Sequence, residues 1–262
     1  MANPVIPVVR LEGVIASGRG ATGERGLSLA AVEPALVKAF GVKAAPAVAI
    51  AINSPGGSPV QSSLIGRRIR QLAEEKRKRV IVFVEDAAAS GGYWLACAGD
   101  EIIADATSIV GSIGVIGGGF GFVDALARVG VERRVYTAGR RKSQMDPFRP
   151  ERAEDVERID RLLRALHGEF IDWVKQRRGA ALKPHPDLFE GEIFTGREAV
   201  ELGLIDAIGD LNTVLRARYG AKVKLKAIGR QRGSLLQRFF GGAAASVASL
   251  IEERALWARL GL

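Results

Sequence analysis

Apolar and polar positions along the chain predict buried strands that alternate with helices. Short runs rich in β-branched residues, typical of strands buried on both faces, cover residues 6–11, 47–52, 80–84, 101–104 and 134–137. Between them, residues 27–40 and the segment after Pro59 have helical spacing. A longer apolar stripe at steps of three and four predicts a helix over residues 151–178 that ends at Gly179. This alternation predicts an α/β fold around a largely parallel sheet.

Two glycine-rich turns each follow a predicted strand. The first reads NSPGG at residues 53–57, and the second reads ASGGY at residues 89–93. Because ligands collect at the carboxyl ends of strands in an open parallel sheet, both turns are expected to meet at one site. In the second turn, Ser90 could expose its hydroxyl beside the Gly91 N–H, as a nucleophile beside an oxyanion donor does. Close packing of a small-residue helix is the alternative interpretation of residues 87–92.

A serine nucleophile needs a neighbouring base, and histidine is scarce in this chain. A serine hydroxyl is a poor nucleophile until a base takes its proton. The two histidines, His167 and His185, leave little material for a Ser-His-Asp triad. A lysine can replace histidine where its surroundings favour the neutral amine. Lys142 follows Arg140 and Arg141, and from composition alone a solvated basic turn is a better explanation of it than a catalytic role.

Composition and charge narrow the classes of partner and compartment. The chain has 262 residues, a net charge of +9 and one cysteine, Cys97, which excludes an intrachain disulfide and a cysteine-rich metal site. The basic runs at residues 76–79 and 140–142 contain no aromatic residues, so we expect no nucleic-acid partner. We see no secretory signal and no apolar stretch that could span a bilayer. We therefore expect a cytoplasmic protein, with peripheral membrane contact through its basic charge.

Five sequence blocks, taken in order, resemble the signal peptide peptidase A (SppA) family of Ser/Lys peptidases. NSPGG alone is shared with ClpP and its relatives, but the ordered set is specific to SppA. The blocks are NSPGG (residues 53–57), ASGGYW (89–94), GSIGV (111–115), AGRRKSQMDP (138–147) and a closing segment at residues 191–206. The resemblance extends over most of residues 5–215. It implies a ClpP/crotonase-like fold, in which ββα units build a largely parallel sheet flanked by helices.

The resemblance also assigns roles to individual residues. It implies that Ser90 is the nucleophile, that Lys142 is the general base and that Ser112 hydrogen-bonds the lysine. The oxyanion donors would be the amides of Gly91 and of either Gly56 or Gly57. It implies a serine endopeptidase that hydrolyses signal peptides or other unstructured apolar peptides through an acyl-enzyme, with no metal or organic cofactor. Single-copy relatives form rings with the active sites inside, so we expect a homo-oligomer.

Two domains are expected, a peptidase domain at residues 1–220 and a helical extension at residues 221–262. The extension could dock on its own chain or on a neighbouring subunit. Alternatively it could bind a membrane interface through Phe239, Phe240 and Trp257.

Two other functions fit the same sequence. Crotonase-type enzymes also bind an oxyanion through paired backbone N–H groups but process acyl-CoA thioesters. A catalytically silent scaffold would keep the ring and bind peptides or membrane. The Ser90/Lys142 pair and its lysine loop favour the peptidase over the crotonase-type enzyme, whereas the scaffold stays open until Ser90 and Lys142 are substituted.

Overall fold

The computed structural model describes residues 3–18, 26–139, 141–229, 257–258 and 260. The chain divides into two compact units, and the two boundaries between them fall after Gly114 and within α5 (Ala153–Arg178). We call residues 1–114 with 170–262 the sheet unit, and residues 115–169 the small unit. Each unit is described by itself.

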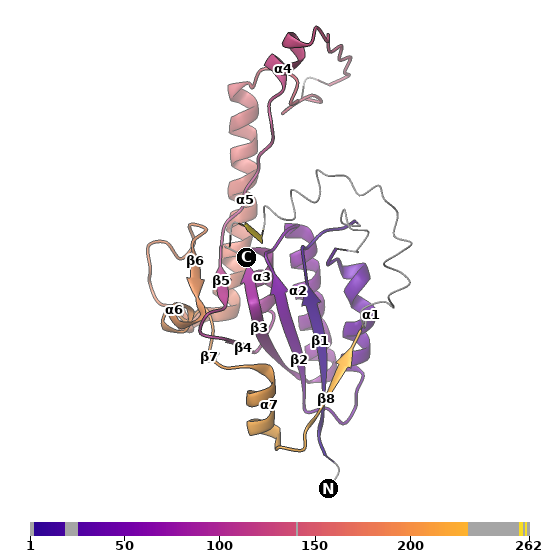
Figure 1. The fold of residues 1–262 in the computed structure, drawn as a ribbon, viewed down its shortest axis with the longest axis vertical. Helices are drawn as coiled ribbons and strands as arrows, with labels where there is room; N and C mark the ends of the chain where they lie inside the picture. Colours follow the sequence, from indigo (N-terminus) through magenta and orange to yellow (C-terminus); the bar gives the residue numbers. More distant parts are fainter. Residues whose placement is uncertain (1–2, 19–25, 140, 230–256, 259, 261–262) are drawn as a thin grey trace. The chain divides into compact units, whose positions relative to one another are not determined.

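Eight strands of the described chain form one sheet in the sheet unit (Figure 1). The order is β6-β5-β3-β2-β1-β8, while β4 pairs with β3 and β7 pairs with β4. Their bounds are β1 Val5–Glu12, β2 Ala47–Ser54, β3 Arg79–Ala89, β4 Glu101–Ala104, β5 Ile109–Gly111, β6 Ile193–Thr195, β7 Ala207–Ile208 and β8 Lys224–Ile228. Every pairing is parallel except β5 with β6. The predicted α/β fold with a largely parallel sheet is confirmed.

The sheet is apolar on both faces, as its continuous hydrophobic strands predict. Side chains alternate along β3: Val80 and Val82 pack in the core on the helix-covered face, while Ile81 and Phe83 pack on the opposite face. Residues of α7 (Leu211–Tyr219) cover part of the second face. Burial on both sides holds the carboxyl ends of β2 and β3 in fixed positions.

Helices cover the first face of the sheet and pack into its core. They are α1 Leu29–Phe40, α2 Pro59–Lys76, α3 Gly91–Ala96, the carboxyl-terminal part of α5 and α6 Gly196–Glu201. The helix α2 begins as the sequence predicts, because the Ser58 side chain accepts a hydrogen bond from the Gln61 N–H and Pro59 occupies the first helical turn. A short 3₁₀ helix, Gly179–Ala181, follows α5.

Two expectations about secondary structure need comment. The strand predicted at residues 134–137 is wrong: this segment is irregular in the small unit, where 91% of Tyr136 is exposed. A β-branched run forms a strand only where a neighbouring strand can pair with it. The helical extension predicted at residues 221–262 begins instead with β8, which pairs with β1. Most of the extension, including Phe239 and Phe240, lies outside the described residues.

The thiol of Cys97, at the end of α3, lies deep in the core. Burial raises the pKa of this thiol from its ordinary value of 9.0 to about 12. We therefore predict that a disulfide reagent such as DTNB leaves Cys97 unmodified in the native chain at pH 8 but modifies one thiol per chain in denaturant. Rapid stoichiometric labelling of the native chain would contradict this placement.

Candidate active site

Ser90 lies on a strained turn between β3 and α3. Its backbone has φ 51° and ψ −121°, in a region that residues with a side chain rarely adopt. The Ser90 N–H donates to the Gly111 carbonyl at 2.8 Å, and the Ser90 carbonyl accepts from the N–H groups of Tyr93 and Trp94 at 2.9 and 3.0 Å. Such strain persists only where the surroundings hold it, and it gathers at active sites. The turn is a strand-to-helix elbow of the kind that presents nucleophiles.

Buried aromatic side chains hold the helix that follows Ser90. The Tyr93 side chain is fully buried, and its hydroxyl donates to the Leu204 carbonyl at 2.7 Å. The Trp94 ring stacks on Phe170 with 4.8 Å between ring centroids, and Trp173 Nε1 donates to the Trp94 carbonyl at 2.9 Å. These contacts fix α3, and with it the position of the Ser90 backbone.

The NSPGG turn packs directly against Ser90. Gly56 has φ 105°, and a Cβ atom at this position would lie 2.8 Å from Ser90 Cβ and 2.9 Å from the Gly91 nitrogen. Only glycine fits there. The Gly56 N–H donates to Ser54 Oγ at 3.2 Å, and that hydroxyl donates to the Gly13 carbonyl at 2.7 Å. The first glycine of the pair therefore has its amide engaged within its own turn.

The next amides, those of Gly57 and Gly91, are unpaired. Within the described part of the chain, neither N–H donates a hydrogen bond. A Cβ atom on Gly91 would lie 3.4 Å from the Gly57 nitrogen, which places the two amides close together. Because buried N–H groups almost always have a partner, two free donors beside a strained serine are unusual. Their arrangement is suited to binding an oxyanion.

Two residues outside the predicted set shape this site. The Ile15 N–H donates to the Gly56 carbonyl at 2.8 Å, and the Ile15 carbonyl accepts from the Ser58 N–H at 2.7 Å. A Cβ atom on Gly91 would come within 2.4 Å of the Ser62 hydroxyl oxygen. These hydrogen bonds hold the turn through the Gly56 carbonyl and the Ser58 N–H, and they do not involve the Gly57 N–H. No local motif marks Ile15 or Ser62, because their roles arise from packing between distant segments.

Ser112 follows β5 and, like Ser90, has a positive backbone φ of 51°. Its N–H donates to the Glu192 carbonyl at 2.7 Å, and its carbonyl accepts from the Gly114 N–H at 2.9 Å. The preceding residue, Gly111, supplies the carbonyl that binds the Ser90 N–H. Ser112 is therefore one residue away from the contact that fixes the Ser90 turn.

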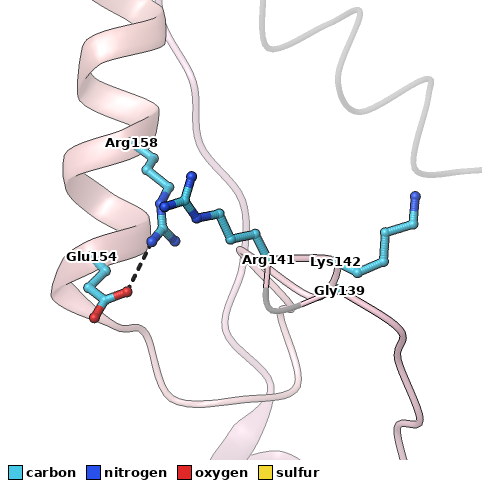
Figure 2. Close-up of a pocket in the computed structure, with 5 residues that line it drawn as sticks. All are labelled: Gly139, Arg141, Lys142, Glu154 and Arg158. Atoms are coloured by element: carbon cyan, nitrogen blue, oxygen red, sulfur yellow. Dashed lines mark hydrogen bonds and ion pairs between the residues drawn. The ribbon is translucent and has the colours of Figure 1, made fainter.

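Lys142 lies in a turn of the small unit. Its backbone N–H donates a hydrogen bond to the Gly139 carbonyl at 3.2 Å. Its side chain is exposed and borders a pocket of about 580 Å³. Figure 2 shows Arg141 reaching toward Arg158 on α5, whereas Lys142 extends away from that helix. Arg158 is paired with Glu154 at 3.0 Å. The amine of Lys142 is thus not tied to this ion pair.

The predicted site residues therefore fall into two groups. The structure brings Ser90, Gly91, Ser112 and both glycines of the NSPGG turn together in the sheet unit. Lys142 belongs to the small unit and is described within it. The sheet unit holds the candidate nucleophile and the candidate oxyanion donors, and the small unit holds the candidate base.

The segment after Lys142 is anchored within the small unit. Asp146 pairs with Arg133 at 3.1 Å, and the Arg133 guanidinium lies 4.9 Å from the centroid of the Phe148 ring. The Phe148 ring also stacks on Phe122, with 5.5 Å between centroids. The Phe148 N–H donates a hydrogen bond to the Asp146 carboxylate. This hydrogen bond is the main cause of the lowered pKa of the Asp146 carboxyl group. These contacts give the lysine-bearing loop a defined end.

Two features are absent from the residues that the structure describes, a cluster of metal ligands and a membrane-spanning helix. Over these ranges, no group of three or more His, Cys, Asp and Glu side chains is placed to hold a metal ion. No helix within the same ranges is both long enough and apolar enough to cross a bilayer.

Comparisons with known proteins match this chain to a peptidase family and to relatives that carry different names. Residues 72–225 match Peptidase family S49. A Brucella abortus protein named "Na(+)/H(+) antiporter NhaA" is 55% identical over 272 aligned positions, which cover 98% of this chain and 37% of that protein. The Arabidopsis thaliana protein named "Serine protease SPPA, chloroplastic" is 30% identical over 214 positions, covering 80% of this chain and 31% of that protein. The chain thus spans about a third of the length of each relative.

A solved structure supports the same fold. A mutant of the 1510-N membrane-bound stomatin-specific protease superposes with a TM-score of 0.56 at 17% identity, covering 88% of this chain and 100% of that one. The Arabidopsis relative and the S49 match confirm the family resemblance predicted from the sequence blocks. The S49 match extends over more than half of the 262 residues, and the chain therefore belongs to peptidase family S49.

Proposed function

We propose that this chain is a serine peptidase that cleaves signal peptides and other unstructured apolar peptides, with Ser90 as nucleophile and Lys142 as general base. One observation carries the proposal: Ser90 is held on a strained turn beside the unpaired amides of Gly57 and Gly91. Membership of family S49 favours peptide hydrolysis over acyl-CoA chemistry on the same type of oxyanion site.

The proposed reaction begins when the neutral Lys142 amine takes the proton from Ser90 Oγ. The oxygen attacks the peptide carbonyl, and the Gly57 and Gly91 N–H groups stabilise the resulting oxyanion. The tetrahedral intermediate collapses, the C–N bond breaks and the Lys142 ammonium protonates the leaving amine. Lys142 then takes a proton from water, which attacks the acyl-enzyme carbonyl. The ester C–O bond breaks, the Lys142 ammonium returns its proton to Ser90 Oγ, and the acid product leaves and loses its proton to solvent as a carboxylate.

This reaction sets a geometric requirement on the small unit. Lys142 Nζ must come within hydrogen-bond reach of Ser90 Oγ, at about 2.6–3.2 Å, in the active enzyme. We propose that the Ser112 hydroxyl accepts a hydrogen bond from the amine and directs it toward Ser90. Between the two glycines of the NSPGG turn, we favour Gly57 as oxyanion donor, because the Gly56 N–H donates to Ser54 Oγ.

We also propose that the chain works as a homo-oligomer. Large apolar side chains of the small unit are exposed, among them Phe120 at 80%, Ile116 at 71% and Val129 at 69%. Exposed apolar surface of this kind is typical of an interface. The net charge of +9 supports peripheral contact with an anionic membrane on the cytoplasmic side.

The division into a peptidase domain and an extension stays a proposal. Because β8 (Lys224–Ile228) belongs to the main sheet, we favour a boundary after Ile228 over one at residue 220. The Brucella abortus relative is named as a whole protein, and the segment that aligns with this chain makes up 37% of its length. We propose peptidase activity only for the segment that aligns with this chain.

A fluorophosphonate probe tests the proposed nucleophile. We expect one covalent label per chain, located at Ser90 by peptide mass spectrometry, because the probe reacts with activated serine hydroxyls. The Ser90→Ala variant should remain unlabelled, while Ser28→Ala, which alters a serine whose side chain makes no capping hydrogen bond, should label normally. An unlabelled folded chain that turns over acyl-CoA would favour a crotonase-type enzyme. An unlabelled folded chain with neither activity would favour a silent scaffold.

A further inference from the structure

Basic side chains gather where the strands of the sheet begin, at the end that we call the basic edge. The strands β1, β2, β3 and β8 are parallel and start at this end, and α1, α2 and α7 each lead into one of them through a short turn. A helix that returns the chain to a parallel strand ends beside the start of that strand. The exposed members of the basic edge are Lys38, Lys43, Lys76, Arg77, Lys222 and Lys224.

Hydrogen bonds join the segments that carry these residues. The Lys78 side chain donates to the Val42 carbonyl, which links the turn after α2 to the turn that carries Lys43. The Lys224 N–H donates to the Pro4 carbonyl at 2.9 Å, at the start of β1. In Figure 1 the strands β1, β2 and β3 point away from this end of the sheet. The turns with the basic residues therefore share one end of the sheet.

The carboxylates at this end leave the basic edge with excess positive charge. Glu101 is shared by two arginines, Arg79 at 3.0 Å and Arg218 at 2.6 Å. Asp100 pairs with Arg70 at 2.7 Å. Two more carboxylates near the end of α2 are those of Glu74 and Glu75. Among the described residues, no member of the basic edge forms an ion pair, so their charge faces water without a fixed partner.

The stability of the fold accounts for only part of this charge. Lys38 and Lys76 lie in the last turns of α1 and α2, where a positive charge interacts favourably with the helix dipole. Lys43 lies beyond the end of α1, and Lys222 lies beyond the end of α7. Lys224 begins β8 at the edge of the sheet, where lysine also discourages pairing with another chain. The remaining positive charge fits a partner with a negative surface.

We infer that the basic edge binds the surface of an anionic membrane. This inference rests on the proposed function, in which the chain contacts a membrane peripherally, and assigns that contact to one surface. Each lysine close to an anionic bilayer raises affinity about fivefold. The aromatic residues at this end, Phe40 and Tyr219, pack against the core clusters and do not lie open to stack on bases. The basic edge therefore fits a bilayer better than a nucleic acid.

Binding through the basic edge sets the direction in which Ser90 faces. Arg79 begins β3 at the basic edge, and Ser90 follows the opposite end of the same strand. At about 3.3 Å per residue, β3 spans roughly 30–35 Å. With the basic edge on a bilayer, Ser90 lies on the far side of the sheet, in water. The substrates are then peptide segments that have left the bilayer or extend from it, and not segments buried within it.

Vesicle sedimentation tests the inference on the full chain. We compare the unchanged chain with the triple variant Lys43→Glu, Lys76→Glu and Lys224→Glu. The vesicles contain phosphatidylcholine with or without phosphatidylglycerol. The unchanged chain should bind only the vesicles with phosphatidylglycerol, and added salt should weaken this binding. The triple variant should bind these vesicles at least about a hundredfold more weakly, because three favourable charges become unfavourable.

A second triple variant controls for net charge. It carries Arg128→Glu, Arg161→Glu and Arg197→Glu, which change the charge equally at exposed positions outside the basic edge. It should lose less than about fivefold in affinity, because charges far from the bilayer are screened. Glutamine at the three lysine positions gives a milder version of the first variant, and circular dichroism verifies folding.

Three results would overturn the inference. Equal losses in the two triple variants would show that net charge, and not the basic edge, attracts the membrane. Unchanged binding in folded lysine variants would leave these lysines the protection of the edge strand as their role. Tighter binding to a fluorescent DNA duplex than to the vesicles at the same salt concentration would indicate a nucleic-acid surface.

Hydrolysis separates this inference from the proposed function. The lysine variant should cleave a water-soluble unstructured peptide with unchanged kcat/KM, and saturating phosphatidylglycerol vesicles should leave kcat/KM of the unchanged chain the same. If the basic edge binds vesicles but no variant hydrolyses peptide, the peptidase proposal fails and the membrane surface stands. If bound vesicles block hydrolysis, or if the lysine variant binds vesicles normally and hydrolyses peptide, the inference fails and the peptidase stands.

Discussion

Ser90→Ala is expected to lower kcat for hydrolysis of an unstructured apolar peptide by at least about a thousandfold. The substitution removes the oxygen that forms the acyl-enzyme, while Gly57 and Gly91 keep their unpaired amides. Residual rate from the oxyanion donors alone should be small. The measurement is release of a quenched fluorophore from a peptide substrate, with kcat and KM determined separately. KM should change little, because the variant keeps the peptide-binding surface.

Lys142→Ala should reduce kcat to a similar extent, because a serine hydroxyl without a base is a poor nucleophile. Two residues that act as one unit give non-additive losses. The double variant should therefore be about as slow as either single variant. Lys43→Ala, at another exposed lysine, controls for the loss of one positive charge and should retain full activity. Unchanged hydrolysis in both single variants would refute the dyad.

The sequence predicts most of the sheet because its strands are buried on both faces. Residues 47–52 and 80–84 are continuous apolar runs, and each lies within the observed strand β2 or β3. Residues 134–137 show a similar local pattern but form no strand, because pairing depends on neighbours that a local pattern does not report. In the same way, β8 needs β1 as its partner, and the two are more than 200 residues apart in the chain.

The candidate site is predictable only in part for a related reason. The glycine and serine residues of the two turns can be recognised in the sequence. The family resemblance identifies Lys142 as the candidate base. The choice between Gly56 and Gly57 depends on one hydrogen bond to Ser54, which no sequence pattern encodes. Residue types identified the chemistry, whereas long-range contacts decide which atoms are free to perform it.

Gly56→Ala is expected to reduce both fluorophosphonate labelling of Ser90 and kcat/KM for peptide hydrolysis by about a hundredfold or more. An added methyl group would lie 2.8 Å from Ser90 Cβ and 2.9 Å from the Gly91 nitrogen. Those separations are far inside van der Waals contact, so the Ser90 turn and the oxyanion donors must shift. Displacements of about 1 Å cost about a hundredfold in rate where catalysis depends on positioning.

Gly13→Ala is the matched control for backbone strain. Gly13 has φ 97°, close to the 105° of Gly56, but among the described residues no heavy atom lies within 4 Å of its added Cβ. Both variants should lose roughly 1–2 kcal/mol of unfolding free energy from the left-handed backbone, measured by urea denaturation. Only Gly56→Ala should also lose labelling and hydrolysis. Equal activity in the two variants would show that contact between the NSPGG turn and Ser90 does not position the nucleophile.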